Sequence, residues 1–393
     1  MKFAHLGDCH LGSWRQPELQ ELNFLSFQTA IDKIIKEKIE FVLIAGDLFD
    51  SAYPPIEILK RTFAEFRKLK EADIKVFMIA GSHDFSVSGK TFLDVLEKGG
   101  FCEICKYEES DVMINLLPLK YKSFEIFGYP GKKSGMEIED LRKIVLPKET
   151  NNFRILMLHT TIKEAIGDLP IESISMKSFP KADYYALGHL HINFNEKIHD
   201  KPIIYSGPIF PNSFQELDDL CYGRFYMVIV EGYVEPKRQD IILKDVITFK
   251  IKIENALTAT SQIMDELEKH ELTDKIVLMK LFGEIKKGTN ADIDYLKIED
   301  YLKLKRVYSF LKNTNKLVSE GEKIDIKISE HDVNKIEETL IKEYETKNPN
   351  KFNNLIVPLM HSLELQKQED EKSAIYESRL FSELNKILGL ELR

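Results

Sequence analysis

Short, continuous apolar runs alternate with helical patterns along the first part of the chain, up to about residue 230. Strands of a sheet that is covered on both faces read as such runs, because neither side of the strand meets water. Two segments between them, 19–38 and 56–71, place apolar residues at the spacing of one helix face. The predicted strands are Lys2–Leu6, Phe41–Ala45, Lys75–Ala80, Arg154–Leu158, Tyr184–Leu187 and Ile203–Tyr205. This alternation predicts a layered α/β fold.

The pattern changes near residue 232. Phe249–Ile253 and Ile276–Leu281 read as strands, and Ser261–His270 between them reads as a helix. These elements predict a small α+β module, and the apolar residues of the last segment recur at helical spacing amid dense charge. The predicted parts are a first domain at 1–235, the module at 240–316, a linker at 317–349 and a helical segment at 350–393.

Composition is that of a globular protein, with 43% hydrophobic and 30% charged residues. No apolar stretch approaches the ~18 residues of a membrane span, so we expect a soluble, cytoplasmic protein. The net charge of −9 counts against nucleic-acid binding, for which proteins are often basic. Residues 301–316 carry five basic and no acidic residues, so the net charge of the whole chain does not exclude a local basic face.

Candidate chemistry gathers just past the ends of the predicted strands. The motifs found there are Asp8-Cys9-His10, Gly46-Asp47, Gly81-Ser82-His83-Asp84, His159 and Gly188-His189-Leu190-His191. Each of them alone is more often a turn, a helix cap or a core histidine than a ligand set. However, the carboxyl ends of parallel strands meet at one sheet edge, so the five motifs converge. Mixed carboxylate and imidazole ligands suit Mn, Fe or Zn, and the set predicts a metal pair.

As a set, these motifs resemble those of the calcineurin-like metallophosphoesterases. The order and spacing are similar to one branch above all, the SbcD-type DNA double-strand-break repair nucleases. The segments Tyr205-Ser206-Gly207-Pro208 and Ser213-Phe214-Gln215-Glu216 also resemble that branch. The resemblance covers about half of the chain. It implies a metallophosphoesterase sandwich with a small α+β capping domain and a helical C-terminal tail.

The resemblance also implies a ligand set for two Mn²⁺ ions per chain. Asp47 would be shared between the two ions. One ion would be held by Asp8, His10, Asp47 and His191, and the other by Asp47, His159, His189 and Ser82.

Other roles are implied by position in the same motifs. His83 would be the catalytic histidine, and Asp84 would orient it. Two positions depart from the family. Ser82 stands where the family usually has an asparagine ligand, and serine is shorter and binds metal more weakly. Asp50 stands where this branch often carries histidine.

In function, the resemblance implies an endonuclease and 3′–5′ exonuclease that repairs DNA double-strand breaks in the nucleoid. Its partners would be DNA, a second copy of the chain and an SMC-like coiled-coil ABC ATPase that binds the C-terminal helices. The homodimer face would use 56–71 and 91–98, although both segments could equally pack on the sheet. Phosphate contacts are proposed for a group that is as readily a solvated strand pair: Lys303, Lys305, Arg306, Lys312 and Lys316.

Two other functions fit the same residues. One is a small-molecule phosphodiesterase or nucleotidase on the same metal core. The other is a scaffold whose site has decayed at Ser82. The capping module and the long tail favour the DNA nuclease, because an enzyme for small substrates has no need of a partner-docking segment.

Overall fold

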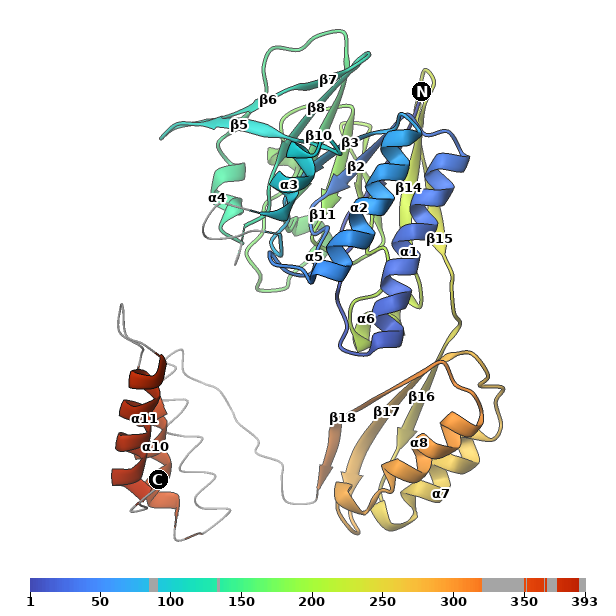
Figure 1. Ribbon diagram of the computed structural model, residues 1–393, viewed down its shortest axis with the longest axis vertical. Helices are drawn as coiled ribbons and strands as arrows, with labels where there is room; N and C mark the ends of the chain where they lie inside the picture. Colours follow the sequence, from blue (N-terminus) through green and yellow to red (C-terminus); the bar gives the residue numbers. More distant parts are fainter. Residues whose placement is uncertain are drawn as a thin grey trace. The chain divides into compact units, whose positions relative to one another are not determined.

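A computed structural model describes residues 1–84, 91–132, 135–319, 350, 352–363, 365 and 373–388 (Figure 1). They belong to two compact units, of which the first is Met1–Gly283 with Lys287–Leu317 and the second contains the C-terminal helices. The predicted linker at 317–349 lies almost entirely outside the described residues. Within the described ranges, no helix is long and apolar enough to cross a membrane.

Two six-stranded sheets form the core of the first unit. One has the strand order β15-β14-β1-β2-β3-β4, and the other has the order β12-β13-β11-β10-β8-β7. The strands of the first sheet are β1 (Lys2–Leu6), β2 (Phe41–Ala45), β3 (Lys75–Ile79), β4 (Glu103–Ile104), β14 (Gly223–Val230) and β15 (Val234–Ile241). Those of the second are β7 (Leu119–Tyr121), β8 (Phe124–Tyr129), β10 (Phe153–His159), β11 (Tyr184–Gly188), β12 (Phe194–Ile198) and β13 (Lys201–Tyr205).

The two sheets pack against each other through an aromatic layer. Phe3 of β1 stacks on Phe41 of β2 with ring centroids 5.1 Å apart, and its edge meets Tyr184 of β11 at the same distance. The central strands run parallel in both sheets, as β1-β2-β3 and as β8-β10-β11-β13. Since both faces of these strands are buried, their apolar runs are continuous, and all six predicted strands are confirmed to within two residues at either end.

Helices cover the outer face of the first sheet (Figure 1). α1 (Pro17–Lys36) begins at a proline, which suits the first turn of a helix because its missing N–H has no intrahelical partner there. α2 (Ile56–Glu71) turns Leu59, Phe66 and Leu69 toward the sheet. The smaller helices of this unit are α3 (Phe92–Lys98), α4 (Glu137–Leu141), α5 (Lys163–Ile166) and α6 (Phe214–Leu220). A separate three-stranded sheet is made of β5 (Lys106–Glu109), β6 (Ile114–Leu117) and β9 (Ile144–Val145).

The predicted α+β module is a three-stranded sheet with two helices, called here the capping sheet. Its elements are β16 (Val246–Lys252), α7 (Ala256–Leu267), β17 (Ile276–Ile285), α8 (Tyr295–Leu304) and β18 (Ser309–Ser319). Residues 301–316, considered above as a strand pair, are instead the end of α8 and most of β18. The Tyr308 hydroxyl donates to the Glu18 carbonyl of α1 at 3.1 Å, which ties the module to that helix.

The second unit contains α10 (Ile356–Leu363) and α11 (Ser373–Leu388), which pack on each other. The helical prediction for this segment is therefore confirmed over these residues. Several apolar side chains stay exposed, among them Val357, Leu363 and Phe381.

Candidate metal centre

The predicted site residues lie at the carboxyl ends of five strands, three from one sheet and two from the other. Asp8 and His10 follow β1, Asp47 follows β2, and Ser82 to Asp84 follow β3. From the second sheet, His159 ends β10 and the pair His189 and His191 follows β11. The edge formed by the parallel strands therefore collects chemistry from two halves of the chain.

Three overlapping groups of side chains could each hold a metal ion, and in each group all ligand atoms lie within 4.8 Å of one another. They are Asp8, His10 and His191, then Asp8, Asp47 and His159, and at the rim His10, Asp50 and His83. His159 Nε2 lies 3.2 Å from Asp47 Oδ2, and His10 Nε2 lies 3.1 Å from His191 Nε2. Five of the seven predicted ligands thus converge on one buried centre.

The other two predicted ligands lie beside this centre. The backbone N–H of His189 donates to Asp8 Oδ1 at 2.8 Å, and its ring centroid is 5.0 Å from that of His159. The Ser82 hydroxyl donates to Asp47 Oδ2 at 3.4 Å, at the long limit of a hydrogen bond.

The donor set fits a divalent cation. Asp8 Oδ2 is buried and has no hydrogen-bond partner, which is costly unless another ligand binds it. His159 Nε2 is also buried, and it faces Asp47 Oδ2 at 3.2 Å. The remote nitrogens of two rings are held by neighbours, His159 Nδ1 by the Ala45 carbonyl at 2.9 Å and His191 Nδ1 by Glu216 at 2.9 Å. A ring whose Nδ1 donates presents the Nε2 lone pair for coordination.

Charge at the centre is strongly coupled. Burial opposes ionisation of Asp47, but the nearby histidines, His159 first, outweigh it and hold the pKa of this carboxyl below its usual range. Burial would lower the pKa of His159, but the Asp47 carboxylate raises it to about 10. His189 behaves oppositely, because burial and then the charge of His159 lower its pKa to about 4. The metal-free centre therefore stores a proton on His159.

His83 lies at the rim of the centre, with 47% of its side chain exposed. Its backbone N–H donates to Asp47 Oδ1 at 2.7 Å, and its Nδ1 is 2.9 Å from the Asp50 carbonyl oxygen. The carboxylate of Asp84 is buried and accepts from the backbone N–H groups of Leu48, Phe49 and Gly81. Asp84 thus fixes the loops that follow β2 and β3. Its orienting role toward the His83 ring stays a prediction, and Asp50 is added as a contact of that ring.

The backbone around the centre is unusual. Asp8, His10, Asp47 and His189 have φ angles of 51°, 44°, 50° and 101°, in a region that side chains other than glycine rarely adopt. Such strain costs on the order of 1–3 kcal/mol for each residue and persists at functional sites. Gly188 permits close packing, because a Cβ there would lie 2.0 Å from the Ala45 carbonyl oxygen.

Glu216 had no role assigned from sequence, whereas the sequence indicates Asp50 as a second carboxylate that could make the field more negative or support the ligands. Glu216 contacts His191, and Asp50 Oδ1 lies 3.2 Å from His10 Nδ1. The Ser213-x-x-Glu216 spacing is a sequence signal for a helix start, although it gives no hint of the second contact to His191.

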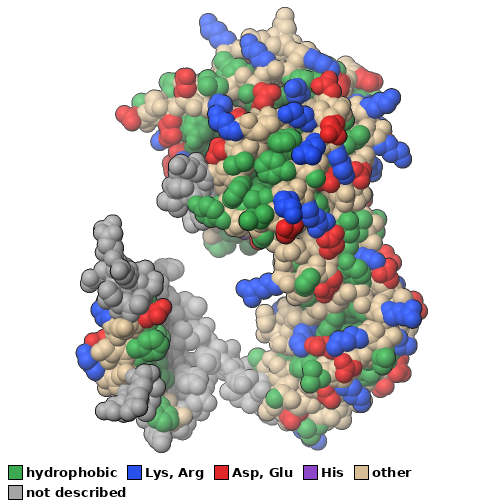
Figure 2. All heavy atoms as spheres, viewed as in Figure 1, with side chains coloured by type: hydrophobic (Ala, Val, Ile, Leu, Met, Phe, Trp, Pro, Cys, Tyr) green, Lys and Arg blue, Asp and Glu red, His purple; other side chains and the backbone are tan. Residues whose placement is uncertain are grey.

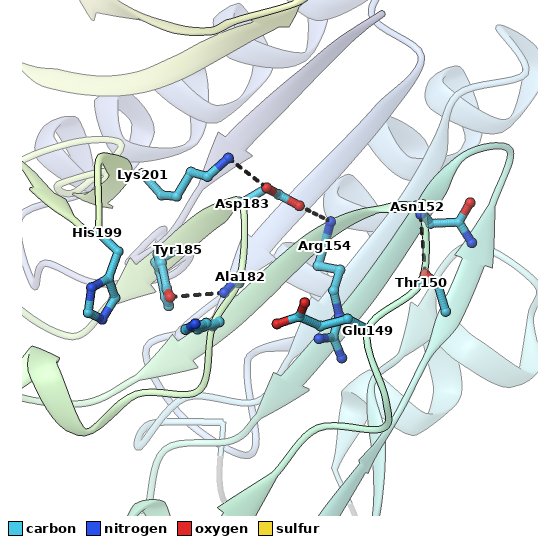
Figure 3. Close-up of a pocket in the computed structure, with 10 residues that line it drawn as sticks. Glu149, Thr150, Asn152, Arg154, Ala182, Asp183, Tyr185, His199 and Lys201 are labelled. Atoms are coloured by element: carbon cyan, nitrogen blue, oxygen red, sulfur yellow. Dashed lines mark hydrogen bonds and ion pairs between the residues drawn. The ribbon is translucent and has the colours of Figure 1, made fainter.

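A pocket of about 430 Å³ opens at the amino ends of β10 and β11, the opposite end from the candidate ligands (Figure 3). Charged side chains that line this pocket form ion pairs and hydrogen bonds with neighbouring residues of the fold. Lys201 pairs with Asp183 at 2.8 Å, and Asp183 also accepts from the backbone N–H of Arg154. None of the predicted site residues lines this pocket.

The predicted DNA contacts are exposed side chains on α8 and β18 and the turn between them, remote in sequence from the metal centre. Two of them are already paired, Lys303 with Asp300 and Lys312 with Glu299, both at 3.1 Å. Lys305 lies over the Tyr301 ring, 5.4 Å from its centroid. Arg306 and Lys316 are exposed.

Comparison with known proteins places these features in context. Residues 1–193 match the family described as calcineurin-like phosphoesterase. Three relatives are described as DNA double-strand break repair protein Mre11. That of Methanocaldococcus jannaschii is 31% identical over 315 residues, which cover 76% of this chain and 80% of the relative. Those of Archaeoglobus fulgidus and Methanosarcina mazei are 25% and 28% identical, covering 68% and 84% of this chain and 62% and 52% of the relatives.

Proposed function

Because this chain belongs to the Mre11 family of calcineurin-like phosphoesterases, we propose that it is a DNA double-strand-break repair nuclease that uses two Mn²⁺ ions. It is a metal-dependent phosphodiesterase with a divalent-metal site of Asp and His groups. The observation that carries the proposal is a pair of adjacent ligand groups that bring Asp8 and Asp47 together with His10, His159 and His191. Two neighbouring groups of carboxylate and imidazole ligands are what a two-metal phosphoesterase needs.

We assign the ligands as follows. Asp8, His10, Asp47 and His191 hold one ion. Asp47, His159, His189 and Ser82 hold the other, Asp47 being shared. The 3.2 Å contact of Asp47 with His159 and its 3.7 Å contact with His10 support the shared position.

Bound at this centre, the ions would neutralise phosphate oxygens and lower the pKa of a bridging water. The chain supplies the rest of the chemistry. His83 is exposed at the rim, where a substrate phosphate can reach it. Since its Nδ1 lies on the Asp50 carbonyl oxygen, Nδ1 carries a proton, and Nε2 is the atom that would transfer a proton to the leaving oxygen.

DNA beyond the scissile phosphate would meet the capping sheet. Lys303, Lys305, Arg306, Lys312 and Lys316 would bind the sugar-phosphate backbone, a contact that carries no sequence preference. As endonuclease and 3′–5′ exonuclease the enzyme needs grip on the backbone more than base recognition. Lys305, Arg306 and Lys316, for which no acidic contact is described above, are expected to contribute most.

Two protein partners complete the proposal. The exposed apolar residues Val357, Leu363 and Phe381 of the C-terminal helices suit docking on a coiled-coil ABC ATPase. On the first unit, apolar side chains gather over α2 and α3 (Figure 2). Ile56 and Val95 there are 72% and 48% exposed, which supports a homodimer through this face.

One comparison tests the activity. With Mn²⁺ present, the protein is expected to degrade linear duplex DNA and to act weakly on bis-p-nitrophenyl phosphate. Hydrolysis of the small ester alone would instead identify a small-molecule phosphodiesterase.

The variant His83→Leu tests the mechanism. It should bind Mn²⁺ as the wild type does and lose about 10²- to 10⁴-fold in rate on DNA, because only the proton transfer is removed. Undiminished nuclease activity of this variant would exclude His83 from catalysis.

A further inference from the structure

The short helix α6 begins directly behind the metal centre. Its N-cap residue Ser213 accepts a hydrogen bond from the backbone N–H of Glu216 at 3.2 Å, and the Ser213 hydroxyl donates to Glu216 Oε1 at 3.1 Å. The other oxygen of the same carboxylate, Oε2, lies 2.9 Å from His191 Nδ1. One side chain therefore closes the helix and holds a candidate ligand.

This contact sets the geometry of His191. A carboxylate on Nδ1 fixes the tautomer and the ring rotation, so that Nε2 faces Asp8 Oδ1 at 3.9 Å and His10 Nε2 at 3.1 Å. Rotating the ring away from Glu216 would withdraw Nε2 from both neighbours.

The same turn reaches the other side of the centre. The backbone N–H of Asn212 donates to Glu216 Oε2 at 2.8 Å, and its side-chain amide lies 3.5 Å from Asp50 Oδ1. Asp50 Oδ1 is in turn 3.2 Å from His10 Nδ1. Both His10 and His191 thus have their remote nitrogens on residues that meet at the start of α6.

The outer side of α6 is held by the capping sheet. Lys280 of β17 contacts Asp218 at 2.5 Å and donates to Gln215 Oε1 at 3.2 Å. Lys250 of β16 lies 4.0 Å from the same Asp218 oxygen. The Asp218 side chain is only 8% exposed, so this carboxylate is shielded from water and depends on its lysine partners.

We propose that Glu216 is a positioning residue for the metal ion bound by His191, and that Asp218 couples it to the capping sheet. The path runs from Lys280 to Asp218, then two residues back along α6 to Glu216, and on to His191. A ligand that displaces the capping sheet from α6 would thereby loosen the ion at the centre. The inference rests on the metal centre proposed above, and it adds a role for residues outside that ligand set.

Metal binding by the full chain tests the first step. Mn²⁺ affinity is measured by titration calorimetry and by electron paramagnetic resonance of the free ion, and thermal unfolding is recorded without metal. Glu216→Ala is expected to weaken one site about 10- to 100-fold. Glu216→Gln keeps the size of the side chain and should fall between this variant and the wild type. Asp219→Ala changes an exposed acid of the same helix and should bind as the wild type does.

The coupling is tested with Lys280→Met, which keeps the aliphatic stem and removes the charge. Its Mn²⁺ affinity should fall about two- to tenfold. Combined with Glu216→Ala it should cause no further loss, because both changes break one path. Unchanged affinity in Glu216→Ala, or a lowered metal-free melting temperature with affinity intact, would overturn the positioning role. Additive losses would overturn the coupling. If the wild type itself took up no Mn²⁺, the metal centre would fail and this proposal with it.

Discussion

Metal binding by this protein should depend steeply on pH, because His159 must lose a proton before it can coordinate. The pKa of this ring is raised to about 10 by Asp47, so the folded, metal-free protein holds a proton there at any pH below about 10. A metal ion competes with that proton. Asp47 adds nothing to the competition, since its pKa is lowered and it is already ionised at neutral pH.

The size of the effect follows from the distance between pH and pKa. A solution at pH 7 is three pH units below the His159 pKa of about 10, so the ring is protonated. Displacement of this proton costs about 4 kcal/mol, or roughly a thousandfold in apparent affinity. Affinity should therefore rise about tenfold for each pH unit between pH 7 and 9. Binding should release about one proton at pH 8.

Calorimetry at several pH values, in two buffers of different ionisation enthalpy, measures both quantities. His189→Asn is the matched control. With a pKa lowered to about 4 this ring is already neutral, so its loss should weaken binding without changing the slope. An affinity for Mn²⁺ that is flat between pH 7 and 9 would refute the assignment of the stored proton to His159.

Three further outcomes are expected. First, the raised pKa of His159 stabilises the metal-free protein fully below pH 6.5, and this stabilisation is lost as the pH rises through 10. The melting temperature of the metal-free protein should therefore drop between pH 6.5 and 10. A constant melting temperature would contradict this. Second, Gly188→Ala should lower the unfolding free energy in urea by about 3 kcal/mol, because its Cβ would overlap the Ala45 carbonyl. Gly232→Ala, with φ of 73° but open space, should cost only about 1 kcal/mol, and equal losses would count against the packing argument. Third, Ser82→Asn should tighten one Mn²⁺ site, since the longer amide oxygen can reach the ion; weaker binding would argue against position 82 as a ligand.

Much of the fold was predictable because the strands that carry site residues are also the most apolar. Several strands were not predicted, among them β8 at Phe124–Tyr129 and β14 at Gly223–Val230. β8 is interrupted by Glu125 and Gly128 within its run. β14 runs antiparallel to β1, so its carboxyl end points away from the metal centre and no ligand follows it. Neither strand is followed by a candidate ligand, so the motifs at strand ends did not indicate either of them.

The convergence of the candidate ligands was predictable from sequence, and the side chains that hold them in place were not. Motif order indicated which carboxylates and imidazoles converge, because parallel strands end at one edge. What holds each ring depends on loop geometry that no spacing encodes. Glu216 is 25 residues from His191, and Asp50 meets His10 across two loops. Residues 320–349, where part of the linker and tail predictions fall, lie outside the described ranges.

The place of β1 in its sheet has a consequence for synthesis. This strand is made before the other strands of its sheet, yet it is an interior strand whose second edge pairs with β14, Lys2 opposite Ile229. A nascent chain leaving the ribosome therefore presents Asp8 and His10 long before His191 exists. At about 5–20 residues per second, the interval is on the order of 10–40 s. Until His191 and β14 have been made, the centre lacks its closing ligands, and a growing chain is expected to extend past Val230 before it can cut DNA.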